Sequence, residues 1–222
     1  MRTAPRAILF DLDGTLVDSV PDLAHGVDRM LEALGSEAAG PDSVRKWVGN
    51  GVERLVKRAL TGELDAEPEP TVFEEALEIF LEHYRLANGR HSRLFPDVAR
   101  TLETLHERGV ALGCVTNKPE AFTHPLLDHF GLRSLFGTIV AGDTVAEKKP
   151  HPLPLWTAAD ELGIAREQTL FVGDSIHDVE AARRAKMPVI CVSYGYNHGH
   201  DIAEAHPDQV IDNLAELIAS TA

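Results

Sequence analysis

Short, continuous runs of apolar and β-branched residues recur along the chain. Because these runs are not interrupted by polar positions, they are typical of strands buried on both faces of a parallel sheet. The runs cover residues 7–11, 111–117, 137–143, 169–174, 188–194 and 209–212. We expect them to form the strands of one sheet.

Segments with helical periodicity alternate with these runs, and several are followed by a glycine, as is common just past the end of a helix. They cover residues 98–109, 121–131, 153–163, 177–186 and 214–220. This alternation predicts an α/β protein with a doubly wound, Rossmann-like parallel sheet.

The alternation breaks between about residues 20 and 90. Helical periodicity is present at 22–35, 52–60 and 71–89, and we find no convincing strand. The acidic stretch at 61–70 is interpreted as a solvated loop. We therefore predict an all-helical cap domain over residues 19–90, inserted into an α/β core made of residues 1–18 and 91–222.

Composition excludes some partners. The chain has 222 residues, 21 Lys and Arg against 35 Asp and Glu, and a formal charge of −14, which repels nucleic acid and anionic membranes. The apolar stretch before Asp11 is too short for a signal peptide, and no later run is long enough to span a membrane. We expect a cytoplasmic protein in which Cys114 and Cys191, both within apolar runs, are free thiols rather than a disulfide.

Two aspartates stand directly at the end of the first apolar run. Asp11 and Asp13 project to the same side of an extended segment, where two charges about 4 Å apart repel by about 4 kcal/mol at an effective dielectric constant of about 20. A divalent cation would relieve this repulsion. The alternative is ordinary turn chemistry, completed by Gly14 and Thr15.

Three further strands also end on polar residues. Because the carboxyl ends of parallel strands form the ligand-binding edge of such a sheet, we expect these side chains to lie near Asp11 and Asp13. They are Thr116, Asn117, Lys149, Asp174 and, one step into the following helix, Asp178.

The strings "DLDGT", "VTN", "KKPHP" and "GDSIHD" resemble, in order, the four signature motifs of the haloacid dehalogenase-like hydrolase superfamily. The resemblance covers nearly the whole chain, and the helical insert corresponds to the mobile cap of that family. A closer similarity, through "LVDSVPDL", "WVGNGVERL", "VTNKPEAFTHPLL", "KKPHPLPL" and "VSYGYNHG", is to bacterial phosphoglycolate phosphatases.

The resemblance implies roles for the acidic residues. Asp11 would be the nucleophile that forms an aspartyl-phosphate, and Asp13 would be the general acid and base. Mg²⁺ would be held by Asp11, Asp174 and the backbone carbonyl of Asp13, with Asp178 acting directly or through water. For Asp178 the alternative is a charge at a helix N-terminus.

The phosphate oxygens would be held by Thr116, Asn117 and Lys149, as the resemblance implies. Lys148 is the competing choice for the cation. In the cap, Asn50 lies within a Gly-Asn-Gly string and could contact the substrate, although plain loop chemistry explains it equally well.

His198 and His200 flank Gly199, a spacing that resembles a pair of metal ligands, but no further ligand of matching spacing lies nearby. We interpret them as residues of a solvated loop.

The function that we predict is Mg²⁺-dependent hydrolysis of a small phosphorylated metabolite, with 2-phosphoglycolate giving glycolate and phosphate. Another capped phosphatase or a sugar phosphomutase of the same superfamily is the alternative among enzymes. A phosphoryl-binding scaffold is the alternative outside enzymes, and a protein phosphatase is disfavoured because a large cap would exclude a folded partner. We expect no nucleic-acid or membrane partner and leave monomer or homodimer open.

Overall fold

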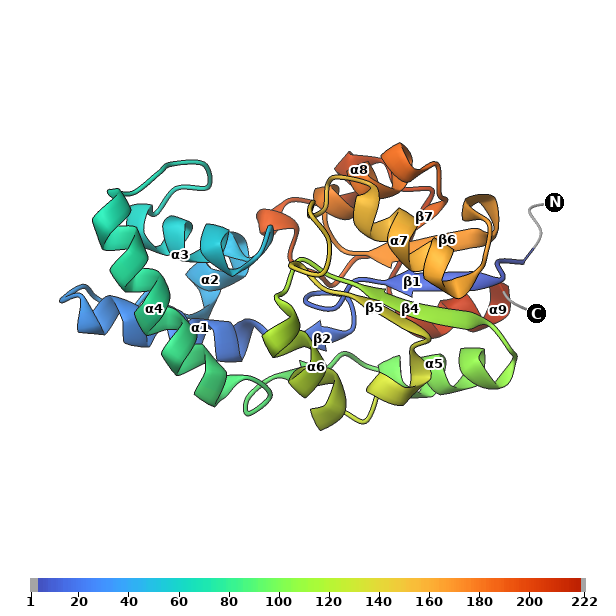
Figure 1. Cartoon of the computed structure of the whole chain (residues 1–222), viewed down its shortest axis with the longest axis horizontal. Coiled ribbons are helices and arrows are strands. Elements are labelled where there is room, and N and C mark those ends of the chain that lie inside the picture. The colour runs from blue at the N-terminus through green and yellow to red at the C-terminus, as the bar shows by residue number, and fades with distance from the viewer. Residues whose placement is uncertain (1–3, 221–222) are drawn as a thin grey trace.

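The computed structural model describes residues 4–220 and consists of an α/β core with four helices at one end (Figure 1). The core sheet has six parallel strands in the order β5-β4-β1-β6-β7-β8, which confirms the predicted doubly wound fold. These strands are β1 (Ala7–Phe10), β4 (Ala111–Val115), β5 (Thr138–Val140), β6 (Thr169–Gly173), β7 (Val189–Val192) and β8 (Gln209–Ile211).

Helices cover both faces of the sheet, so the strands are buried on both sides. Along β1, Ile8 and Phe10 belong to one hydrophobic cluster and Leu9 to the other, as the period of two in a strand requires. One face carries α5 (Val98–Glu107), α6 (Glu120–His129) and α9 (Leu217–Ser220), and the other carries α7 (Leu153–Leu162) and α8 (Ile176–Ala185).

Short 3₁₀ segments complete the core. They are η1 (Arg133–Leu135), η2 (Arg166–Gln168), η3 (Asn197–Gly199), η4 (Ile202–Ala205) and η5 (Leu214–Glu216).

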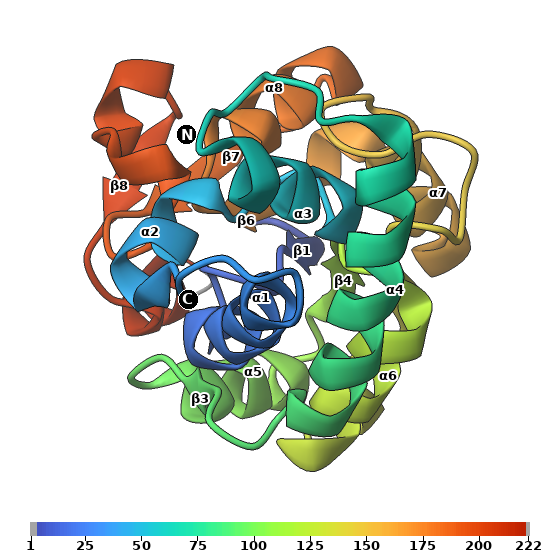
Figure 2. The same cartoon turned by 90° about the vertical axis from the view of Figure 1, so that its left-hand side faces the viewer.

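The four remaining helices pack around a hydrophobic cluster of their own. They are α1 (Val20–Ala33), α2 (Gly40–Trp47), α3 (Val52–Thr61) and α4 (Pro70–Ala87). Helices α1 and α4 approach closely at Gly26, where an added Cβ would lie 3.0 Å from the Phe80 ring. Seen from this end of the molecule, these cap helices lie in front of the strands of the core (Figure 2).

Helix α2 and two short strands were not predicted from the sequence. Helix α2 has only eight residues, of which Val44 and Trp47 alone pack on the cap cluster, so its apolar positions are too few to predict a helix from their spacing. The strands β2 (Val17–Asp18) and β3 (Arg93–Leu94) contain two residues each and have no readable periodicity. The expectation of helices alone between residues 20 and 90 otherwise agrees with the structure.

The two chain segments that connect the core with the cap helices lie side by side. Strands β2 and β3 pair antiparallel, Val17 with Leu94 and Asp18 with Arg93. Next to them, the buried carboxylate of Asp22 accepts hydrogen bonds from the backbone N–H groups of Gly89, His91 and Ser92. The domain boundaries that we predict, at 18/19 and 90/91, fall beside this pairing.

Cys114 and Cys191 are buried free thiols, as expected. Among residues 4–220, no helix is both long enough and apolar enough to cross a membrane.

Candidate active site

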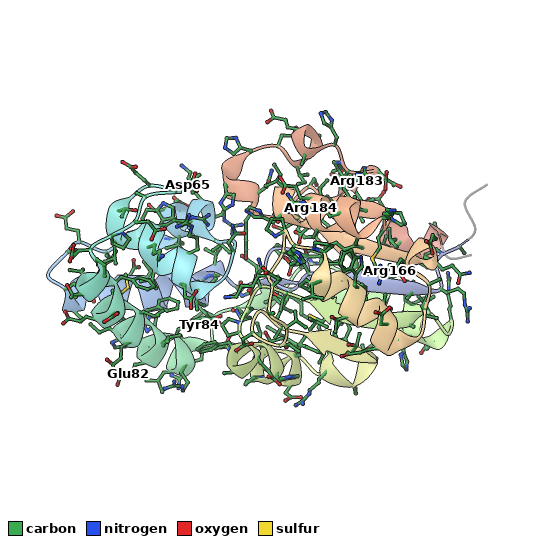
Figure 3. The ribbon with its side chains drawn as sticks, turned by 45° about the horizontal axis from the view of Figure 1, so that its top comes forward. Asp65, Glu82, Tyr84, Arg166, Arg183 and Arg184 are labelled. Carbon is green, nitrogen blue, oxygen red and sulfur yellow. The ribbon has the colours of Figure 1, made fainter. Side chains whose placement is uncertain are left out.

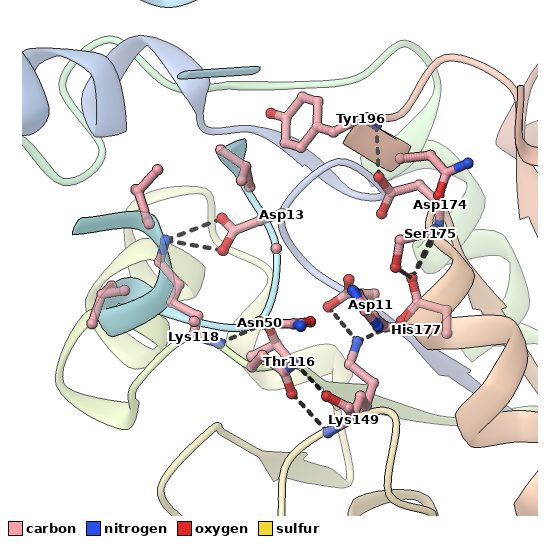
Figure 4. Close-up of a pocket in the computed structure, with 18 of the residues that line it drawn as sticks. Asp11, Asp13, Asn50, Thr116, Lys118, Lys149, Asp174, Ser175, His177 and Tyr196 are labelled. Atoms are coloured by element: carbon pink, nitrogen blue, oxygen red, sulfur yellow. Dashed lines mark hydrogen bonds and ion pairs between the residues drawn. The ribbon is translucent and has the colours of Figure 1, made fainter. Parts of the chain in front are cut away.

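A cavity lies between the carboxyl ends of the central strands and the cap helices. Since β1 pairs with β4 on one side and β6 on the other, residues that follow these three strands meet at one edge of the sheet. The cavity is lined there by Asp11, Asp13, Thr116, Asn117 and Asp174 and, from the loop between β5 and α7, by Lys149 (Figure 4).

Lys149 holds two of the aspartates. Its Nζ lies 2.8 Å from Oδ1 of Asp11 and 2.7 Å from Oδ1 of Asp178. The side chain is only 2% exposed, and although burial alone would lower its pKa, the two carboxylates raise the pKa above its usual value. The buried cation is therefore Lys149, whereas Lys148 is partly exposed and lies 3.9 Å from Glu53.

Asp11, Asp174 and Asp178 each place a carboxylate oxygen within 4.8 Å of the others. Burial raises the pKa of Asp11 to about 7, against the opposing charge of Lys149. Burial and the neighbouring carboxylates also raise the pKa of Asp174 well above its usual value. Three acidic groups packed so closely gain from a countercharge in addition to Lys149.

Asp174 is fixed by hydrogen bonds to both oxygens. The hydroxyl of Thr15 donates to Oδ1 at 3.0 Å, and the backbone N–H of Tyr196 donates to Oδ2 at 2.8 Å. An added Cβ on Gly195 would lie 2.1 Å from Cβ of Asp174, so this position has room only for glycine. The loop after β7 thus holds the Asp174 carboxylate in one orientation.

Asp178 is saturated by protein donors. Its Oδ2 accepts from the backbone N–H of Asp174 and from both the backbone N–H and the hydroxyl of Ser175, which closes a capping box at the start of α8. Burial alone would raise the pKa of Asp178, but the charge of Lys149 outweighs it and the pKa is lowered. Asp178 therefore orients Lys149 and the start of α8, which matches the helix N-terminal role considered from the sequence.

This donor set fits a hard divalent cation. Mg²⁺ prefers oxygen ligands and is usually bound by one or two carboxylates, water and substrate phosphate. Asp11 uses Oδ1 for its contacts with the Leu12 N–H and Lys149, which leaves Oδ2 for a ligand. The acidic cluster is thus chemically suited to a metal ion of this kind.

Asp13 faces a second buried lysine, which the sequence analysis missed. Nζ of Lys118 lies 3.0 Å from Oδ1 of Asp13 and also donates to the hydroxyl of Tyr84, which comes from the cap helix α4. Figure 3 places Tyr84 near the end of α4 that adjoins the core. Burial would lower the pKa of Lys118, but Asp13 and Tyr84 raise it, so the ammonium is charged.

Asn117 has a supporting contact with the Lys149 segment. Its side-chain amide donates to the Lys149 carbonyl and accepts from the Lys149 N–H, both at 2.9 Å. These two hydrogen bonds use the side-chain oxygen and one of the two N–H donors of the Asn117 amide, and they position the Lys149 segment. Thr116 is buried at the end of β4, and its hydroxyl accepts from the backbone N–H of Lys118 at 3.2 Å.

The Gly49-Asn50-Gly51 loop reaches the cavity from the cap. All three residues have positive φ, of 131°, 65° and 89°. Arg58 stabilises the loop by donating to the carbonyls of Trp47 and Gly49. Among the described residues, the buried Oδ1 of Asn50 has no hydrogen-bond partner, so it is available to a ligand.

His198 lies in the loop after β7, as interpreted, but it is half-buried rather than fully solvated. Its Nδ1 lies 2.9 Å from the carbonyl oxygen of Lys46, so the ring is in contact with the cap helix α2. His200 is exposed, as expected. In the part of the chain that the structure describes, neither histidine belongs to a cluster that could hold a metal.

Three residues in or beside the cavity were not predicted from the sequence: Lys118, Tyr84 and Tyr196. Lys118 stands two positions after Thr116, and this spacing was the one available signal. Tyr196 donates from its hydroxyl to Asp18, at the connection to the cap, and accepts from the backbone N–H of Ser19. Neither tyrosine differs in the sequence from an ordinary core aromatic residue.

Comparisons with known proteins agree with this geometry. Residues 8–192 match the model of the haloacid dehalogenase-like hydrolase family. The chain is 51% identical over 217 residues to the phosphoglycolate phosphatase of Nitrosococcus oceani, covering 98% of this chain and 96% of that protein. It is 44% identical to the phosphoglycolate phosphatase of Thiobacillus denitrificans, covering 95% of this chain and 93% of the relative.

Among solved structures, a predicted phosphoglycolate phosphatase from Haemophilus somnus superposes with a TM-score of 0.93 at 36% identity, covering 100% of both chains. The structure of CbbY from Rhodobacter sphaeroides in complex with phosphate superposes with a TM-score of 0.80 at 25% identity, covering 98% of this chain and 99% of the other.

The doubly wound core with acidic strand ends beneath a helical cap is therefore that of a hydrolase, and the chain belongs to the haloacid dehalogenase-like hydrolase family. Within this family it is a phosphatase. The non-catalytic scaffold considered from the sequence is thereby excluded.

Proposed function

We propose that this phosphatase hydrolyses 2-phosphoglycolate to glycolate and phosphate, depends on Mg²⁺ and acts in the cytoplasm. The names of the relatives support the substrate, since they match at about half identity over nearly the whole chain. The observation that carries the proposal is the convergence of Asp11, Lys149 and Asp174 at one edge of the sheet, with Asp13 facing the same cavity.

Asp11 is the nucleophile in this proposal. One of its carboxylate oxygens attacks phosphorus, the bond to the leaving oxygen breaks, and an aspartyl-phosphate forms on Asp11. Lys149 lies 2.8 Å from Asp11 and supplies positive charge where the phosphoryl oxygens would lie, with Thr116 as a neutral donor. Hydrolysis of the acyl phosphate by water then regenerates the carboxylate.

Asp13 transfers the proton at both steps. It donates to the leaving oxygen in the first step and accepts from the attacking water in the second. Its side chain faces Lys118 and the cap, so it serves the leaving-group side of the cavity. The cap helices over this side exclude bulk water from the reaction.

The metal would be held by Asp11, Asp174 and the backbone carbonyl of Asp13, with Asp178 in support through its contact with Lys149. When bound, Mg²⁺ neutralises charge on the phosphoryl group and offsets the repulsion between the carboxylates.

The experiment is a hydrolysis screen over phosphorylated small metabolites, with Mg²⁺ present and after treatment with EDTA. We expect phosphate release from 2-phosphoglycolate that EDTA abolishes and Mg²⁺ restores. Activity that is indifferent to chelation would refute the metal assignment, and a preference for another metabolite would refute the substrate. Net isomerisation of a sugar phosphate would identify a mutase instead.

A further inference from the structure

Two cations line the cavity, and they serve different parts of it. Among the described residues of the lining, Lys118 and Lys149 are the only lysine or arginine side chains. Lys149 forms an ion pair with Asp11, whereas Lys118 forms one with Asp13 (Figure 4). If Asp11 attacks phosphorus and Asp13 protonates the leaving oxygen, Lys149 lies on the phosphoryl side and Lys118 on the leaving-group side.

Lys118 is costly to bury, and the protein compensates its charge through Asp13 and Tyr84. Its side chain is 1% exposed in a site where an ammonium ion needs compensation. Its three N–H donors are met by Oδ1 of Asp13 at 3.0 Å, Oδ2 of Asp13 at 3.2 Å and the Tyr84 hydroxyl. A carboxylate bound in the cavity would share the ammonium with Asp13, in place of the longer of the two contacts with that residue.

We propose that Lys118, supported by the Tyr84 hydroxyl, forms a subsite for a carboxylate group on the leaving alcohol. This inference rests on the proposed function and deepens it, because it assigns the residues that select the substrate class. In 2-phosphoglycolate the carboxylate carbon is two bonds from the ester oxygen. When that oxygen lies about 3 Å from Asp13, on the side of Lys118, the carboxylate can reach hydrogen-bond distance of Nζ, which itself lies 3.0 Å from Asp13.

Other basic side chains near the cap already bind backbone carbonyls or carboxylates of the protein, or are mostly neutral. Arg58 donates to the carbonyls of Trp47, Gly49 and Leu64. Arg54 pairs with Glu67 on the surface of the cap. His177 lines the cavity, but burial lowers its pKa, so it is mostly neutral at neutral pH.

Tyr84 gives the subsite a contribution from the cap. Its ring is fully buried in the cluster of the cap helices, and the ring centroids of Tyr84 and Phe80 are 5.3 Å apart. The hydroxyl is thus held in place by a rigid ring, and its contact with Lys118 orients the ammonium towards the cavity.

The test compares 2-phosphoglycolate with ethyl phosphate, in which a methyl group replaces the carboxylate. Values of kcat/KM are measured for both substrates in the wild type and in Lys118→Met. We expect Lys118→Met to lower kcat/KM for 2-phosphoglycolate by roughly ten- to a hundredfold more than for ethyl phosphate, the loss of one charge-assisted hydrogen bond. An equal loss on both substrates would refute the subsite and leave Lys118 as a support for Asp13 alone.

Tyr84→Phe is the second variant, because it keeps the buried ring and removes only the hydroxyl. Tyr84→Phe should lower the ratio of kcat/KM for 2-phosphoglycolate to kcat/KM for ethyl phosphate, by less than Lys118→Met does. If Lys118→Met fails to fold, the ratio in Tyr84→Phe decides, and an unchanged ratio refutes the subsite. A wild-type protein without activity on 2-phosphoglycolate would instead refute the proposed function, and the two failures are thereby distinguishable.

Discussion

Replacing Lys149 with methionine should destabilise the protein, because methionine keeps most of the apolar length of the side chain but removes the charge between two buried carboxylates. Nζ lies 2.8 Å from Asp11 and 2.7 Å from Asp178. Each contact has a gross attraction of roughly 6 kcal/mol at an effective dielectric constant of about 20. Because desolvation of the ions offsets most of this, we expect a loss of about 3–5 kcal/mol in the free energy of unfolding, as for other buried pairs that lose one partner.

The pH dependence of the free energy of unfolding provides a second test of these ion pairs. Lys149 lowers the pKa of Asp178 in the folded state, so this pair stabilises the protein above the unfolded pKa of the carboxyl group and loses its effect as the pH falls through the folded pKa. The difference in stability between wild type and Lys149→Met should therefore shrink below about pH 5, where carboxyl groups begin to protonate.

The assay is urea unfolding of the metal-free protein at a series of pH values, with Lys148→Met as the matched control. Lys148 is the adjacent lysine, but its side chain is 37% exposed and lies 3.9 Å from Glu53, so its replacement should change the free energy of unfolding by less than about 0.5 kcal/mol. Equal, small effects of the two substitutions, or a loss in Lys149→Met that stays constant down to acid pH, would refute the reasoning.

Three other predictions concern the chemistry and the connection to the cap. Asp11→Asn should lower kcat by at least about 10⁴-fold because it removes the nucleophile, whereas Asp13→Asn should lower kcat by roughly 10²–10⁴-fold and keep phosphate binding, as phosphate release and calorimetry would reveal. Mg²⁺ should bind more tightly as the pH rises from about 6 to 8, because Asp11, with a pKa of about 7, must lose its proton; calorimetry showing an affinity independent of pH would contradict this. Tyr196→Phe should cost about 1–3 kcal/mol in urea unfolding, because the backbone N–H of Ser19 and the carboxylate of Asp18 lose a buried partner; unchanged stability would show that water replaces the hydroxyl.

The core could be predicted from the sequence because its signals are local. Continuous apolar runs such as Ala7–Phe10 predict buried strands, and the polar residue that follows each strand is then placed by topology alone. Asp11, Thr116, Lys149 and Asp174 therefore converge as the motif order indicates. Of the two adjacent lysines, Lys149 is buried and Lys148 is partly exposed, so the structure separates two residues that the sequence presents side by side.

The contacts across the cavity could not be predicted in the same way. Lys118 contacts Tyr84, 34 positions away in the sequence, and Asp13, 105 positions away. No periodicity of apolar and polar residues predicts contacts between such distant positions. The hydrogen bonds between the Asn117 side chain and the Lys149 backbone depend on how two loops approach each other. The contacts that join Lys118 with Asp13 and Tyr84 thus emerge only from the packing of cap against core.

The pairing of β2 with β3 means that the chain leaves and re-enters the sheet-forming part of the molecule at one point. A segment whose two ends adjoin can be exchanged for another of different length or composition without moving any strand. Under the function that we propose, the helices that cover the leaving-group side can therefore change during evolution while Asp11 and the other groups at the strand ends stay in place.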